Sequence, residues 1–312
     1  MMNLQTQLAP CHKRGLLLRN PVVVASGTFG YGVDNANIAE VHQLGAITCK
    51  GTTLHPRRGN EQPRTVETAS GMLNAVGLQN PGIHTVIEKY APIWATWQTP
   101  VIVNISGGTI EEFVELATLL EGVDGVAGIE VNVSCPNVLA GGAVFGTNAH
   151  TVATVTASVR RVTTLPLTVK LSPNSGDVRP TALAATSSGA DAVSLINTIT
   201  GMGIDISKRR PILANVTGGL SGPAIKPIAL RMVYQVAQEL RLSHPRVPII
   251  GIGGISNAND ALEFIMAGAS AVQIGTINFT NPRAGVEIVE GIEEFMYKER
   301  VKSITELVGA AL

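Results

Sequence analysis

The sequence predicts one α/β domain over residues 1–312, a (β/α)8 (TIM) barrel with long βα loops at its C-terminal rim. Three observations support this fold. Eight short apolar runs recur along the chain, helical patterns alternate with them, and no linker or low-complexity segment interrupts the series. A doubly wound open sheet would show the same alternation. It is disfavoured because eight strands would make that sheet unusually wide.

The apolar runs are predicted to be the barrel strands. Their Val and Ile content is nearly continuous, as expected of parallel strands buried on both faces, and a polar residue or glycine closes each run. In chain order the runs are PVVVASG (21–27), AITCKG (46–51), PVIVNIS (100–106), IEVNVS (129–134), LTVKLS (167–172), AVSLIN (192–197), PIIGIGG (248–254) and AVQIGT (271–276).

Helices are predicted between these runs, so that each of the eight strands is followed by one helix. Thr109 and Glu112 form a capping-box pattern, and the helix that begins at Ser256 ends at Gly268. In the segment from 222 to 240, apolar residues recur at intervals of three and four, which predicts one buried stripe. The stripe consists of Ile225, Ile228, Ala229, Met232, Val233, Val236, Ala237 and Leu240.

Three connections, 51–80, 135–147 and 198–222, are too long to be simple turns. All three follow predicted strands. In a barrel they would therefore all lie at the C-terminal rim, where long loops usually contribute to the active site.

Composition limits the classes of function. Lys plus Arg (23) equals Asp plus Glu (23), and no basic run occurs, so binding to nucleic acid or to an anionic membrane is not expected. The N-terminus lacks the apolar core of a signal peptide, and no stretch has the length of a membrane span. Cys11, Cys49 and Cys135 are too few and too scattered for a disulfide framework or a metal cluster. We expect a cytoplasmic protein without a metal, in which Cys49 is an inert buried thiol.

Polar side chains end the first six predicted strands. Because a βα barrel carries its active site at these ends, the side chains should converge on one site. One buried asparagine could simply bond a loop carbonyl, but six convergent polar ends indicate a ligand. The residues are Ser26, Lys50, Asn104, Asn132 with Cys135, Lys170, and Asn197 with Thr198.

The last two strands end in Gly253-Gly254 and Gly275-Thr276. Exposed backbone N–H groups at these positions form the usual phosphate site of the fold, so a phosphorylated ligand is expected. The spacing does not match the dinucleotide-binding fingerprint.

The two lysines leave several chemistries open. Lys170 or Lys50 could form a Schiff base in a lyase, or take part in a structural ion pair. Two lysines with amide side chains also suit a flavin ring, which needs positive charge when reduced. Cys135 differs from the other cysteines because it opens a glycine-rich loop at a strand end, where it could act as a general base. A barrel that binds a phosphorylated ligand without catalysis, as a module for a partner, is the remaining alternative.

Several motifs together resemble the class 1 dihydroorotate dehydrogenases, from about Leu16 to about Gly291. They are NVSCPN, KGTT with PRTVE and LNAVGLQNPG, LTVKLSPN, INT, GGLSGPAIKPIALR, and GIGGI with AVQIGT. NVSCPN with NAVGLQNPG is highly specific. The chain is more similar to the class 1B catalytic subunit than to the stand-alone class 1A enzyme, which reduces fumarate.

The resemblance implies FMN as cofactor, with dihydroorotate bound against it and oxidised to orotate. It implies that FMN contacts Ser26, Lys50, Gly51, Asn104, Asn132, Lys170, Ile196, Gly222, Gly253, Gly254, Gly275 and Thr276. It implies that the substrate contacts Lys50, Asn74, Ala75, Val76, Gly77, Leu78, Asn132, Asn137, Asn197 and Thr198.

The resemblance also implies roles and partners. Cys135 would remove the substrate proton, Lys170 would stabilise the negative charge of the reduced flavin, and Asn132 with Asn137 would orient the substrate ring. The class 1B assignment implies a second subunit that carries FAD and a [2Fe–2S] cluster and passes electrons to NAD⁺. Two copies of each subunit would form a heterotetramer around a homodimer of this chain. The sequence itself has no G-x-G-x-x-G unit and too few cysteines for an iron–sulfur cluster.

Overall fold

The computed structural model describes residues 2–34, 36, 37, 39–133 and 145–312, and its centre is a closed barrel of eight parallel strands. Closure confirms the predicted fold and excludes the open sheet, because the last strand pairs with the first at Gln273 and Val23. In chain order, which is also the order around the barrel, the strands are β3 (Val22–Val24), β4 (Ala46–Thr48), β7 (Val101–Ile105), β8 (Val126–Asn132), β9 (Leu167–Lys170), β10 (Ala192–Leu195), β15 (Ile249–Ile252) and β16 (Ala271–Ile274).

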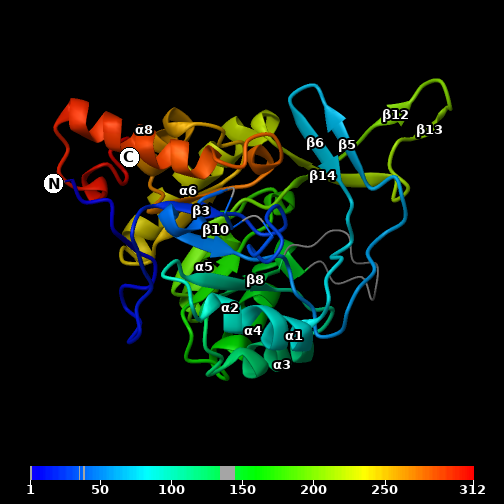
Figure 1. Cartoon of the computed structure of the whole chain (residues 1–312), viewed down its shortest axis with the longest axis horizontal. Coiled ribbons are helices and arrows are strands. Elements are labelled where there is room, and N and C mark those ends of the chain that lie inside the picture. Colours follow the sequence, from blue (N-terminus) through cyan, green and yellow to red (C-terminus); the bar gives the residue numbers. More distant parts are fainter. Residues whose placement is uncertain (1, 35, 38, 134–144) are drawn as a thin grey trace.

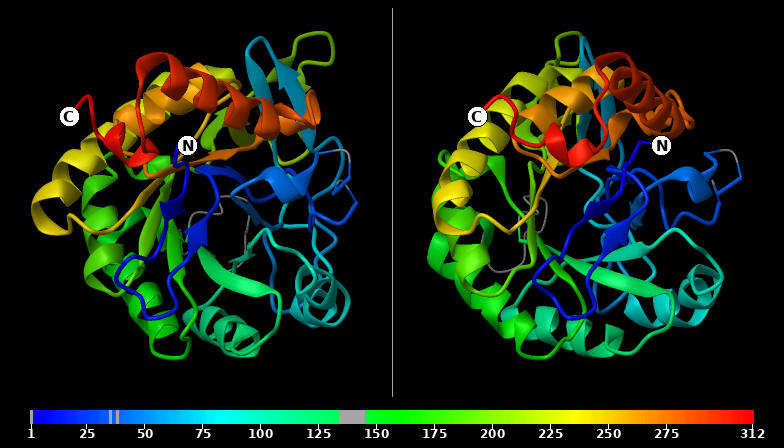
Figure 2. Two further views of the ribbon diagram at one scale, coloured as in Figure 1. Left: turned by 60° about the vertical axis from the view of Figure 1, so that its left-hand side comes forward. Right: turned by 90° about the vertical axis from the view of Figure 1, so that its left-hand side faces the viewer.

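Helices surround the barrel (Figure 2). They are α1 (Ile83–Thr85) and α2 (Ala91–Trp94), joined by the π-helical turn η2 (Val86–Tyr90), then α3 (Ile110–Leu120), α4 (Ala149–Arg160), α5 (Arg179–Ser187), α6 (Lys226–Ser243), α7 (Ala258–Met266) and α8 (Ala284–Glu299). The prediction of a helix after every strand is wrong for β3. In the described part of that connection only the 3-10 turn η1 (Val41–Gln43) forms. Gly27, Gly30 and Gly32 have φ of 91°, 56° and 82°, which an α-helix does not allow.

The predicted helix ends are close to those observed. The Thr109 side chain accepts a hydrogen bond from the Glu112 N–H at 3.3 Å, but the Glu112 carboxylate bonds Gly108, so only half of the capping box forms. Helix α7 is capped by Asn257, one residue after the predicted Ser256, because the Asn257 side chain reaches the N–H of Asp260. The buried stripe of α6 is confirmed except for Ile228, which is 38% exposed.

An N-terminal hairpin closes one end of the barrel. Strands β1 (Thr6–Gln7) and β2 (Leu17–Leu18) pair antiparallel. Leu8, Leu16 and Leu18 pack in one buried cluster with the barrel residues Val23, Ala46, Ile102, Ala192, Ile250 and Ala271. Figure 2 shows this segment, in dark blue, lying across the barrel end. The apolar packing makes this end part of the core.

A second sheet, here called the cover sheet, projects from the barrel beside its strands (Figure 1). Its order is β11 (Ile199–Met202), β14 (Thr217–Ser221), β6 (Gly71–Asn74) and β5 (Thr65–Thr68), all antiparallel. Two of the three predicted long loops, 51–80 and 198–222, therefore pair with each other. The third, 135–147, lies outside the described residues except for η3 (Phe145–Thr147).

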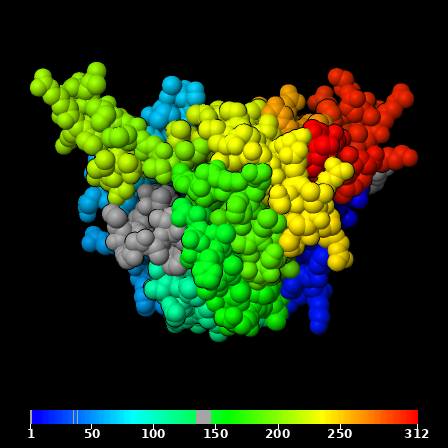
Figure 3. Space-filling view, turned by 180° about the vertical axis from the view of Figure 1, so that it is seen from behind, coloured from blue at the N-terminus to red at the C-terminus, as the bar shows by residue number. Residues whose placement is uncertain are grey.

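Strands β12 (Ile204–Asp205) and β13 (Arg210–Pro211) form a separate two-stranded sheet, in an arm that stands away from the body (Figure 3). Ile206, between the two strands, is 85% exposed. No helix in the described part of the chain is long and apolar enough to cross a membrane.

Candidate active site

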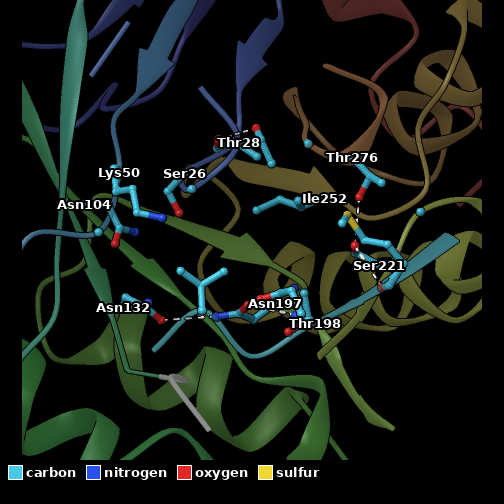
Figure 4. A pocket seen from close by; sticks show the side chains of 18 of the residues that line it. Ser26, Thr28, Lys50, Asn104, Asn132, Asn197, Thr198, Ser221, Ile252 and Thr276 are labelled. Carbon is cyan, nitrogen blue, oxygen red and sulfur yellow. Dashed lines mark hydrogen bonds between the residues drawn. The ribbon is translucent and has the colours of Figure 1, made fainter. Parts of the chain in front are cut away.

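A pocket lies at the C-terminal ends of the barrel strands, beside the cover sheet (Figure 4). It brings together most of the site residues that were predicted from the sequence. Those that line it are Ser26, Lys50, Gly51, Asn74, Val76, Gly77, Leu78, Asn104, Asn132, Lys170, Ile196, Asn197, Thr198, Gly222, Gly254, Gly275 and Thr276. Other residues line the pocket but were not predicted from the sequence as site residues, among them Thr28, Thr65, Met72, Ser221, Ile252 and Phe279.

Four of the predicted residues are not among the lining. Ala75 is fully buried, and its side chain packs in a small cluster with Leu73 and Leu213. Gly253 precedes the lining residue Gly254, and a Cβ on it would meet Ala229 at 2.8 Å. Cys135 and Asn137 lie outside the described residues.

Lys170 forms part of the pocket floor. It is the last residue of β9 and only 5% exposed, and its ammonium donates to the Ser26 hydroxyl at 3.3 Å. It also forms an ion pair with Glu130 on β8, at 3.9 Å. The floor of the pocket thus carries a buried positive charge with a buried counter-ion below it.

Glu130 is the functional candidate that the sequence reasoning missed. It is fully buried, and its carboxylate accepts a hydrogen bond from Asn104 Nδ2 at 2.7 Å. A charged residue within a run of Val and Ile was the sequence feature that could have revealed it, because a parallel barrel strand has no solvent face to hold a carboxylate.

Amide side chains form a second group, beside the cover sheet. Asn197 Nδ2 donates to Asn132 Oδ1 at 3.2 Å, and Asn197 Oδ1 accepts from the N–H of Thr198 at 2.8 Å. Asn74 Nδ2 donates to the carbonyl of Gly219 at 3.2 Å. The first two contacts lie at the barrel ends, and the third lies within the cover sheet. The arrangement offers amide and hydroxyl groups to a polar planar ligand.

The glycine ends form a backbone-lined corner of the pocket. Among the described residues, the N–H groups of Gly254, Gly275 and Thr276 have no backbone acceptor. A Cβ on Gly254, whose φ is 74°, would lie 2.7 Å from the Lys226 side chain. Gly222, just before η5 (Pro223–Ile225) and α6, lies against Gly254, since its carbonyl oxygen would be 2.9 Å from that Cβ. N–H groups without a backbone acceptor in such a corner fit a phosphate.

The cysteines that the structure describes are not part of this pocket. Cys49 is fully buried, and burial raises the pKa of its thiol to about 12. This confirms the predicted burial of the thiol, and the raised pKa disfavours the thiolate, which is the reactive form. Cys11 is exposed.

The chain is similar to known proteins over nearly its whole length. The family model for dihydroorotate dehydrogenase matches residues 11–296. Relatives named "Dihydroorotate dehydrogenase B (NAD(+)), catalytic subunit" include those of Geotalea daltonii (56% identity over 296 residues, 95% of each chain) and Desulforamulus reducens (54% over 292 residues, 94% of each). The protein with that name from Thermoanaerobacter pseudethanolicus is 52% identical over 309 residues, 99% of each chain.

Proposed function

This chain belongs to the dihydroorotate dehydrogenase family, and we propose that it is the catalytic subunit of an enzyme that oxidises dihydroorotate to orotate in de novo pyrimidine biosynthesis, with NAD⁺ as final acceptor. The observation that carries the proposal is one pocket in which Lys50, Asn132, Lys170 and Asn197 meet. The sequence had left a Schiff-base lyase and a non-catalytic binding module open. Family membership favours neither.

FMN is the cofactor of this proposal, and two features of the pocket fit it. The unpaired N–H groups of Gly254, Gly275 and Thr276 suit its phosphate, with Gly222 and Gly253 beside them. The buried oxygen Oδ1 of Asn104 has no partner among the described residues, so it can accept a hydrogen bond from a ring. The remaining ring contacts would be Ser26, Lys50, Gly51, Asn132, Lys170 and Ile196. When bound, FMN accepts the hydride that leaves dihydroorotate.

The protein residues would divide the remaining work. Lys50, Asn74, Asn132, Asn197 and Thr198 would hold the substrate, together with Asn137 and the segment 75–78. The backbone φ angle of Leu78 is 55°, which is unusual for a leucine, and that of the preceding Gly77 is 74°. Strained backbone of this kind is often found at ligand sites.

Cys135 would remove the substrate proton as a general base. Lys170 would place its ammonium where negative charge develops, and its burial at 5% exposure strengthens that interaction because little water screens it.

A partner subunit that carries FAD and a [2Fe–2S] cluster completes the proposal, in a heterotetramer with two copies of this chain. Its support is the word "catalytic subunit" in the names of the relatives, together with the three cysteines of the sequence, one fewer than a Cys₄ cluster needs. We propose the cytoplasm as the location, since unpaired thiols suit a reducing compartment.

The test is an anaerobic half-reaction. Protein loaded with FMN should be yellow and should lose its flavin absorption in one turnover with dihydroorotate, then stall with NAD⁺ until the partner subunit is added. Steady turnover of the lone chain with fumarate would instead indicate the class 1A type. A colourless protein that borohydride traps on a keto substrate would indicate the lyase.

Cys135→Ala should retain FMN but slow its reduction by roughly 10²–10⁴-fold, because a positioned base is lost. The exposed Cys11 is the matched control, and Cys11→Ala should react at the wild-type rate. Stopped-flow absorbance at the flavin band measures both. A Cys135→Ala variant as fast as Cys11→Ala would remove Cys135 from the mechanism.

A further inference from the structure

Glu130 lies at the centre of the barrel, where its carboxylate gathers partners from four other strands. Oε1 accepts from Asn104 Nδ2 on β7 at 2.7 Å and lies 3.9 Å from Lys170 Nζ on β9. Oε2 accepts from Ser194 Oγ on β10 at 2.8 Å and from Gln273 Nε2 on β16 at 2.9 Å. Glu130 and Gln273 do not line the pocket, so the carboxylate acts from below it.

The Glu130 carboxylate determines which way these amides face, because both donate to it. An ionised carboxylate only accepts hydrogen bonds, so Asn104 and Gln273 must both turn their NH₂ groups toward it. Their carbonyl oxygens must then point away. Asn104 Oδ1 and Gln273 Oε1 are two of the few buried side-chain atoms without a partner in the described part of the chain. The two unpaired oxygens are therefore a direct consequence of the carboxylate.

Of these two oxygens, that of Asn104 belongs to a residue that lines the pocket. It would lie 3.0 Å from a Cβ placed on Gly51, which lines the pocket too. Gln273 is held from two sides, because its Nε2 also donates to Thr48 Oγ1 at 3.1 Å. The carboxylate thus presents an acceptor at the pocket floor and places a negative charge beside Lys170.

We infer that Glu130 is a positioning residue for the bound cofactor: it turns the Asn104 carbonyl into the pocket as an acceptor and offsets part of the charge of Lys170. The inference rests on the proposed function, since it concerns how the floor meets FMN. It assigns a role to a buried acidic side chain that makes no contact with the ligand itself.

The test compares Glu130→Gln with Ser194→Ala. FMN is titrated into each apoprotein and its binding is followed by flavin fluorescence. The midpoint potential of the bound FMN is then measured by redox titration. Glu130→Gln keeps the shape but adds a donor, so Asn104 is no longer forced to present its oxygen. FMN affinity should fall roughly tenfold. The midpoint potential of bound FMN should become more positive, since a negative charge that disfavours the reduced, anionic flavin is gone.

Ser194→Ala is the matched control. It removes a partner of the same carboxylate but leaves Asn104 and Lys170 in place, so affinity and potential should stay at the wild-type values. The inference is overturned if either value in folded Glu130→Gln equals wild type, or if Ser194→Ala has the same effect as Glu130→Gln. A wild-type protein that binds no FMN would contradict the proposed function rather than this role.

Glu130→Asp covers the case in which Glu130→Gln does not fold. It keeps the charge and withdraws the carboxylate from Asn104 by one methylene, so affinity should fall while the potential stays close to wild type. Wild-type affinity in folded Glu130→Asp would equally overturn the inference.

Discussion

The floor of the pocket and the cover sheet are built in different ways. The floor consists of side chains on the barrel strands, such as Lys170 and Asn104, and Glu130 below it contacts both through an ion pair and a hydrogen bond. The cover sheet instead joins two loops far apart in the sequence through backbone pairing, such as that of Gly219 with Asn74. The floor should therefore govern the cofactor and the stability of the barrel, whereas the cover sheet should govern the substrate. Variants in each region can separate these effects.

The largest effect is expected for Lys170→Ala, in the floor. The change leaves the fully buried Glu130 carboxylate without its cation, which typically costs about 3–5 kcal/mol of unfolding free energy. FMN retention should be lost as well, or the reduced flavin should become harder to form. Urea unfolding of the apoprotein and the flavin content of the purified variant measure these changes.

Removal of both charges is the control for Lys170→Ala. In Lys170→Ala/Glu130→Gln no unpaired charge remains, so part of the lost stability should return. If Lys170→Ala unfolds within about 1 kcal/mol of wild type and keeps its flavin with an unchanged potential, the ion pair has no such role.

A smaller and more selective effect is expected in the cover sheet, for Gly219→Ala. A Cβ at Gly219 would lie 2.0 Å from Thr198 Oγ1, so Thr198, a proposed substrate contact, must move. Misplacement by about 1 Å can cost roughly 10²-fold in kcat/KM for dihydroorotate, while FMN content should not change. Steady-state kinetics with the partner subunit, or with an artificial acceptor, would measure this loss.

Gly201 on the neighbouring strand β11 is the matched control. A Cβ there would meet the end of the Leu73 side chain at 3.3 Å and Leu220 Cβ at 3.9 Å. Gly201→Ala should therefore change kcat/KM by no more than about twofold, which is less than 0.5 kcal/mol. The separation of the two regions would be contradicted if kcat/KM fell equally in Gly219→Ala and Gly201→Ala, or if Gly219→Ala lost FMN.

The smallest effect is expected at the tip of the arm, for Ile206→Ser. Because Ile206 is 85% exposed, its replacement should change the unfolding free energy by no more than about 0.5 kcal/mol, with FMN content unchanged. Urea unfolding checks this directly. A loss above 1 kcal/mol would mean that the tip packs on part of the protein in solution.

The amino-acid sequence by itself determined the barrel and its polar rim. Strands that are buried on both faces are apolar along most of their length, so all eight could be found from runs such as PVVVASG. Since parallel strands end at one rim, the polar residue that closes each run could be assigned to the pocket without further information. Lys50, Asn104 and Lys170 were found in this way, and all three line it. The first connection was the exception, because its glycines adopt positive φ angles where the repeat alone had implied a helix.

Only the tertiary structure decided the cover sheet and the role of Glu130. The pairing of β6 with β14 depends on backbone groups more than 140 residues apart, and backbone hydrogen bonds leave little trace in residue type. Glu130 alternates with Ile129 and Val131 like any strand residue, and its sequence position cannot show that Asn104, Ser194 and Gln273 converge on it. A barrel brings these side chains together because it closes, and closure is a property of the whole chain.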